Sequence, residues 1–167
     1  MIDLAALEPD VLALAGALRA RRWKLVTAES CTGGLIAGAC TAVAGSSDWF
    51  DRGFVTYSNE AKVELLGVDA ARIAAHGAVS EEVARAMCAG ALARSPAQLG
   101  LAVTGIAGPG GAVPGKPVGT VWMAWGTAAG IGAVRLQLAG DRAAVRAAAV
   151  AAALARLRRA AEAGAGR

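Results

Sequence analysis

The chain has 167 residues, a length typical of one domain that can bury a hydrophobic core. Hydrophobic residues make up 56% of the sequence and charged residues 18%, which excludes a disordered chain. Charged, polar, Gly or Pro residues interrupt every apolar stretch before about 18 residues, so we expect no membrane-spanning helix. The net charge of +4 comes with scattered arginines, and we therefore expect no nucleic-acid partner.

The N-terminus and the cysteines indicate the compartment. The first ten residues, MIDLAALEPD, lack the basic start and apolar run of a secretory signal, so we expect a cytoplasmic protein. Cys31, Cys40 and Cys88 show neither C-x-x-C spacing nor a histidine at metal-ligand spacing. His76 stands without a second histidine. We expect reduced thiols, a structural role for His76, and no metal or other cofactor.

Helices and strands alternate in the first half of the chain. The expected elements there are a helix over 9–21, a strand over 24–28, a helix that Thr32 caps and that ends near Val43, a strand over 53–57, a helix capped by Ser58 or Asn59, and a helix from Ser80 to about Arg94. Two helices are thus expected between the second and third strands.

The second half of the chain predicts a strand over 99–103, followed by a long Gly/Pro-rich loop over 104–117. Strands over 118–125 and 131–138 form an expected antiparallel hairpin, and Asp141 caps a final Ala-rich helix. The predicted fold is a three-layer α/β/α sandwich around a mixed, mostly parallel sheet of about five strands. In such sheets, ligands bind at the carboxyl ends of the strands.

Rare polar residue types gather in one short segment. The single tyrosine, Tyr57, the single asparagine, Asn59, and Ser46, Ser47 and Lys62 fall within 17 consecutive residues. Ser47 and Lys62 could act as nucleophile and base, because a lysine in the first turn of a helix has its pKa lowered by the helix dipole. The alternative interpretation is that Ser47 caps a short turn and Lys62 is a solvated cation.

Two further segments follow predicted strands. Glu29–Gly34 could bind an anion or a carbonyl oxygen through backbone N–H groups, and Thr104–Pro109 allows close approach of its backbone. Arg142, near a helix N-terminus, is a candidate phosphate-binding residue. The alternatives are two tight turns and an exposed arginine. Whether Ser30 or Cys31, at a helix N-terminus, shares the nucleophile's role stays open.

Taken together, these segments resemble the CinA C-terminal domain family, the nicotinamide mononucleotide (NMN) amidohydrolases, over nearly the whole chain. The motifs that carry the resemblance are Thr27–Gly34, Ala44–Ser47, Gly53–Lys62, Gly77–Ser80, Thr104–Pro109 and Lys116–Thr120. The resemblance implies hydrolysis of the NMN carboxamide to nicotinate mononucleotide and ammonia. It also implies a catalytic serine–lysine pair at Ser47 and Lys62 with Tyr57 nearby.

The resemblance implies a nucleotide pocket, whose expected residues are Ser30, Thr32, Gly33, Thr104, Gly105, Ile106, Ala107, Gly108 and Arg142. It further suggests a homodimer. Some family members carry an additional N-terminal molybdopterin-binding-like domain, for which this chain has no room, so we expect a single amidohydrolase domain over 1–167. The alternative from another functional class is an idle nucleotide-binding module linked to competence or DNA damage, which ammonia release from NMN would distinguish.

Overall fold

The computed structural model describes residues 3–164. Its α-helices are α1 (Glu8–Arg21), α2 (Leu35–Thr41), α3 (Asn59–Leu66), α4 (Ala70–His76), α5 (Glu81–Ala93) and α6 (Arg142–Ala163). Its strands are β1 (Leu25–Glu29), β2 (Phe50–Val55), β3 (Leu99–Gly105), β4 (Thr120–Thr127) and β5 (Gly130–Gln137). Two short 3-10 helices cover Ala5–Leu7 and Ser46–Asp48.

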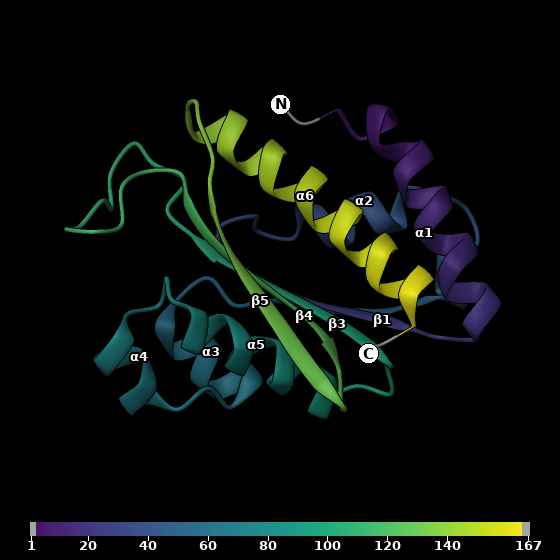
Figure 1. Cartoon of the computed structure of the whole chain (residues 1–167), viewed down its shortest axis with the longest axis horizontal. Helices are drawn as coiled ribbons and strands as arrows, with labels where there is room; N and C mark the ends of the chain where they lie inside the picture. Colours follow the sequence, from purple (N-terminus) through teal and green to yellow (C-terminus); the bar gives the residue numbers. More distant parts are fainter. Residues whose placement is uncertain (1–2, 165–167) are drawn as a thin grey trace.

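The five strands form one mixed sheet in the order β2-β1-β3-β4-β5. β1 pairs in parallel with β2 and β3, whereas β4 is antiparallel to both β3 and β5. Four strands therefore run in one direction and β4 runs in the other. Helices α1, α2 and α6 cover one face of the sheet, and α3, α4 and α5 lie on the other (Figure 1). The predicted three-layer α/β/α architecture and the antiparallel hairpin are confirmed.

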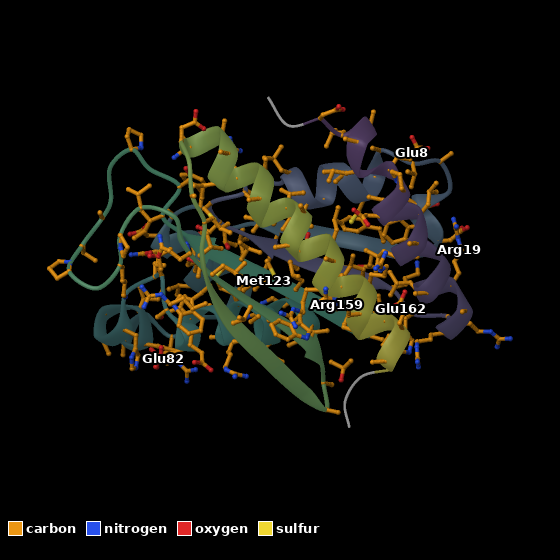
Figure 2. The ribbon with its side chains drawn as sticks, turned by 45° about the horizontal axis from the view of Figure 1, so that its top comes forward. Glu8, Arg19, Glu82, Met123, Arg159 and Glu162 are labelled. Atoms are coloured by element: carbon orange, nitrogen blue, oxygen red, sulfur yellow. The ribbon has the colours of Figure 1, made fainter. Side chains whose placement is uncertain are left out.

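Each face of the sheet has its own hydrophobic core. Met123 of β4 is fully buried in the core under α1 and α6 (Figure 2), whereas Met87 of α5 is buried on the opposite face. Trp125 packs against the first core and Trp122 against the second, so the two indoles lie on opposite faces of the sheet. The Arg156 guanidinium covers the Trp125 ring at 4.2 Å from its centroid.

Three expectations about local structure were wrong. β2 begins at Phe50 rather than residue 53, because its start pairs with the start of β1. A third helix, α4, lies between β2 and β3; the Asp69 side chain caps it by accepting from the backbone N–H of Ala71. The Thr32 hydroxyl does not cap α2, because it donates to Glu29 instead, and Gly34 is the N-cap residue.

The described residues offer neither a membrane span nor a metal-binding cluster. No helix within residues 3–164 is long and apolar enough to cross a bilayer. Within the same range, no three side chains of His, Cys, Asp or Glu type come together in a way that could hold a metal ion.

Candidate active site

The carboxyl ends of the three parallel strands lie side by side. Glu29, the last residue of β1, is in register with Val55 of β2 on one side and Val103 of β3 on the other. The segments that leave this edge are the turn 30–34, the segment 56–58 and the loop 106–119. The parallel pairing therefore brings three predicted motifs to one place.

Lys62 of α3 is the central charged group at this edge. Its side chain is only 1% exposed, and its Nζ lies 3.1 Å from Ser30 Oγ. The amine also donates to the backbone carbonyl oxygen of Thr56 at 3.0 Å, with those of Tyr57 and Ser58 farther away at 3.5 and 3.4 Å. The fold thus holds one amine and one hydroxyl in hydrogen-bond contact.

Burial lowers the pKa of Lys62 below its ordinary value of 10.5, against weaker opposing effects of Cys31 and Glu60. The predicted direction, expected from the helix dipole and from partial burial, is the same, and burial is the main cause. A lysine that loses its proton more readily can accept one from a hydroxyl, so Lys62 is equipped to act as a general base toward Ser30.

The buried carboxylate of Glu29 organises the turn that carries Ser30. Glu29 Oε2 accepts from Thr32 Oγ1 at 2.7 Å and from the backbone N–H groups of Gly34 and Ile36, and its Oε1 accepts from that of Ala37 at 2.8 Å. These bonds satisfy N–H groups at the start of α2 with a negative charge, which also suits the helix dipole. Glu29 therefore fixes the turn against α2.

The next two backbone N–H groups after Ser30 have no hydrogen-bond acceptor on another residue in the described part of the chain. Ser30 N–H donates to the Val103 carbonyl and Gly33 N–H to the Ser30 carbonyl, whereas Cys31 and Thr32 N–H find no backbone or side-chain acceptor on another residue within 3–164. In hydrolases with a serine on a sharp turn, the N–H that follows the serine stabilises the oxyanion. The turn offers the same type of donor.

Ser47 does not come near Lys62. It lies in the short helix before β2, whereas Lys62 follows the carboxyl end of that strand, and a six-residue strand spans roughly 17–20 Å. Arg19 of α1 anchors the Ser47 turn by donating to the Gly45 carbonyl at 2.9 Å. Figure 2 shows Arg19 on the opposite side of the molecule from Glu82, which lies at the start of α5. The serine that contacts Lys62 is Ser30, so the expected Ser47–Lys62 pair is corrected to Ser30–Lys62.

Tyr57 and Arg142 meet at the same edge of the sheet. The Tyr57 side chain is 59% exposed, and its hydroxyl accepts from Arg142 at 2.8 Å. Arg142 also donates to the carbonyl oxygen of Gly108 at 3.0 Å and so connects α6 to the loop after β3. The phenol thus faces Arg142, and only the Tyr57 carbonyl faces the Lys62 amine.

The predicted segment Thr104–Gly108 follows β3 into this region. Thr104 is buried, and its hydroxyl donates to the Ala78 carbonyl at 2.9 Å, which joins the segment to the turn before α5. Ile106 N–H donates to the Thr120 carbonyl, and the N–H of Gly119 donates to the Ile106 carbonyl. Backbone contacts thus hold this part of the loop at the base of β4.

An open hollow of about 740 Å³ lies at the N-terminus of α6. Its lining residues are Ala107, Pro109, Val118, Gly140, Asp141, Arg142, Ala143 and Arg146. Such a volume accommodates a small organic ligand. Arg142 at its border provides positive charge for an anionic group.

Glu29 and Arg146 were not among the individual site residues expected from the sequence. Arg146 donates to the backbone carbonyls of Cys31 and Thr32 at 3.1 and 3.2 Å. One signal was present for each residue: Glu29 is a carboxylate immediately before a Gly-containing turn, and Arg146 lies four residues after Arg142, on the same helix face.

Cys31 is a poor nucleophile in this setting. Its side chain is 5% exposed, and burial raises its pKa to about 11. The thiol is therefore protonated near neutral pH, whereas thiol chemistry requires the thiolate. Of the two residues left open as additional nucleophiles, the geometry favours Ser30.

Comparison with known proteins gives consistent results. The model of the CinA C-terminal domain matches residues 9–161. The chain is 54% identical over 131 residues, 78% of its length and 79% of the relative's, to nicotinamide-nucleotide amidohydrolase PncC of Escherichia coli K12. It is 53% identical over 137 residues, 82% of its length and 86% of the relative's, to the protein of the same name from Pseudomonas putida. A crystal structure of a CinA superfamily protein from Klebsiella pneumoniae superposes with a TM-score of 0.90 at 42% identity, covering 94% of this chain and 98% of the other.

Proposed function

Since the chain belongs to the CinA C-terminal domain family, we propose that it is a nicotinamide-nucleotide amidohydrolase that converts NMN and water to nicotinate mononucleotide and ammonia. The names of its relatives support this substrate, and the contact between Lys62 and Ser30 supports the chemistry. We further propose that residues 1–167 act as one amidohydrolase domain.

The observation that carries the proposed mechanism is the 3.1 Å contact between Lys62 Nζ and Ser30 Oγ in a buried setting. In the reaction, neutral Lys62 takes the proton of the Ser30 hydroxyl while Oγ attacks the carboxamide carbon of NMN. The backbone N–H groups of Cys31 and Thr32 stabilise the negative charge that develops on the amide oxygen. Ser30 takes the nucleophilic role here in place of Ser47.

The second half of the reaction reverses the proton transfer. The Lys62 ammonium gives its proton to the leaving nitrogen as the carbon–nitrogen bond breaks, which releases ammonia and leaves an ester on Ser30. Lys62 then accepts a proton from a water molecule that attacks this ester. Cleavage of the carbon–oxygen bond returns the proton to Ser30 and releases nicotinate mononucleotide.

The remaining residues of the site fit recognition of the nucleotide. Arg142 provides a cation at the hollow by the N-terminus of α6, where the phosphate of NMN would bind. The Tyr57 hydroxyl contacts Arg142, so we assign it to substrate binding rather than to proton transfer. The backbone of residues 104–108 and of Gly33 would line the pocket between these groups.

Ammonia release from NMN tests both the substrate and the nucleophile. The wild-type protein should release ammonia, Ser30→Ala should abolish turnover, and Ser47→Ala should retain it. Cys31→Ala should remain active, because the thiol takes no part. Trapping of a nicotinoyl nucleotide ester on Ser30, detected by mass spectrometry of an acid-quenched reaction, would identify the acyl-enzyme. Loss of activity in Ser47→Ala with an active Ser30→Ala would contradict the proposed pair.

Binding of NMN without ammonia release would indicate the alternative, a nucleotide-binding module without catalysis. Isothermal titration calorimetry with NMN on the same preparation distinguishes this outcome from a protein that does not recognise the nucleotide. Either result would exclude the proposed deamidase activity.

We also propose that the enzyme is a cytoplasmic homodimer. The free, buried thiols of Cys31, Cys40 and Cys88 suit a reducing compartment. Val55 and Leu65 are 48% and 45% exposed, and a second copy would cover part of this apolar surface. Light scattering after gel filtration should give twice the chain mass of 16.6 kDa, about 33 kDa.

A further inference from the structure

Arg146 of α6 forms hydrogen bonds with the turn that carries Ser30. Arg146 is half-buried, and its Nε and one Nη donate to the carbonyl oxygens of Cys31 and Thr32 at 3.1 and 3.2 Å. No carboxylate among residues 3–164 forms an ion pair with it. The guanidinium therefore directs its donors to two consecutive peptide groups and not to an opposite charge.

Because the peptide bond is planar, the two hydrogen bonds from Arg146 to carbonyl oxygens also fix the directions of the N–H groups in the same peptide units. In a trans peptide, the C=O and the N–H of the same unit point in opposite directions. The Cys31 carbonyl faces Arg146, so the Thr32 N–H points away from it. The Thr32 carbonyl also faces Arg146, and the Gly33 N–H on its far side donates to the Ser30 carbonyl at 3.0 Å. The N–H of Gly33 thus points away from Arg146, and the N–H of Thr32 must do the same, because the carbonyl of its own peptide unit also faces Arg146.

The turn is built to allow this approach. Gly33 has φ +60, and a Cβ there would lie 3.4 Å from Arg146 Nη2, so a larger residue would meet the guanidinium. Glu29 holds the opposite side of the turn through Thr32 Oγ1 and the start of α2. The turn is thus held by an anion on one side and a cation on the other.

We propose that Arg146 is a positioning residue for amide hydrolysis: it fixes the peptide groups after Ser30 so that the Thr32 N–H is held ready to donate to the oxyanion. This inference rests on the proposed function, with Ser30 as nucleophile. Within residues 3–164, Arg146 forms no hydrogen bond with Ser30 or Lys62, and it acts through the Cys31–Thr32 peptide. Donors fixed in advance stabilise a transition state without reorganisation during the reaction.

The test separates kcat from KM and uses Arg142 as the matched control. Loss of one oxyanion donor lowers kcat by about 10²–10³-fold, and loosening a donor should cost less, so Arg146→Ala should lower kcat by about 10–100-fold with little change in KM for NMN. Arg142→Ala, one helical turn earlier, should instead raise KM. Methylguanidinium in solution should restore part of kcat in Arg146→Ala and leave the turnover of Arg142→Ala unchanged.

A second variant keeps the test independent of folding. Arg146→Lys retains the positive charge but has no planar fork for two carbonyls, so its kcat should lie between those of wild type and Arg146→Ala. If the Ala variant does not fold, the kcat of the Lys variant decides the question. A variant that raises KM and leaves kcat unchanged would overturn the proposal, because Arg146 would then bind substrate.

Failure of the proposed function gives a different result. If the wild-type enzyme releases no ammonia from NMN, the deamidase assignment is wrong, and the orientation of the turn is then read from Cys31. Cys31 is buried at this turn, so Arg146→Ala should speed its alkylation by iodoacetamide while Cys40 and Cys88 remain protected. Unchanged alkylation of Cys31, or equal acceleration at all three cysteines, would contradict a local positioning role.

Discussion

At the level of single residues, burial of Lys62 determines its proton affinity. Because burial lowers its pKa, kcat/KM should rise with pH through an apparent pKa clearly below the ordinary lysine value of 10.5. The measurement is the pH profile of ammonia release at limiting NMN. An activity that increases only near the ordinary value would show that the amine is not perturbed and would contradict the assignment of Lys62 as base.

The lowered pKa of Lys62 also makes the free energy of unfolding depend on pH. The unfolded chain keeps a lysine proton up to its ordinary pKa, whereas folded Lys62 releases it at lower pH, so between these values the unfolded state binds more protons. The contribution of Lys62 to the free energy of unfolding should therefore rise with pH across this window. Urea unfolding of wild type and Lys62→Met at several alkaline pH values measures it, and the difference between the two proteins should change in that direction.

Replacement of Lys62 by arginine separates charge from basicity. Arginine keeps the positive charge but does not lose its proton near neutral pH, so Lys62→Arg should lower kcat by about 10²–10⁴-fold, the usual contribution of a general base. Lys24→Arg, at the amino end of β1, should remain fully active. Circular dichroism confirms that both variants fold. Substantial turnover in Lys62→Arg would mean that the charge alone is sufficient.

At the level of elements, Glu29 connects β1 to α2. Glu29→Gln would place an amide NH₂ against N–H donors that the carboxylate now satisfies, such as those of Ile36 and Ala37. We expect a loss of about 2–3 kcal/mol in the free energy of unfolding, because buried donors are left unsatisfied. Turnover should fall as well, since the Ser30 turn is held less firmly. Glu64→Gln, an exposed change on α3, is the control and should leave both quantities unchanged.

At the level of the whole molecule, catalysis and nucleotide recognition involve different elements. Ser30 and Lys62 follow β1 and β2, whereas Arg142 belongs to α6, far along the chain. Binding energy from the phosphate would position an amide that contacts other elements. Ammonia release should therefore be efficient with NMN, weaker with nicotinamide riboside and weakest with nicotinamide, measured as kcat/KM. Equal values for all three would show that the phosphate is not recognised.

The sequence by itself determined the layers of the fold and the small set of segments around the site. Apolar periodicity and caps such as Ser58, Ser80 and Asp141 are local signals, and each cap accepts from a backbone N–H as expected. The start of β2 and the helix α4 were missed. The start of β2 is set by its pairing with β1, which is not a local signal. Helix α4 is only seven residues long, and Asp69 is its only local start signal.

Only the tertiary structure decided which residues meet. Ser47 lies 15 positions from Lys62 and Ser30 lies 32, so proximity in sequence favoured the wrong serine. Parallel pairing of β1 with β2 brings the segments after both strands to one edge and leaves Ser47 at the other. The roles of Glu29 and Arg146 depend on the same cause. Their partners are peptide groups, whose positions follow from the fold and leave no trace in residue type.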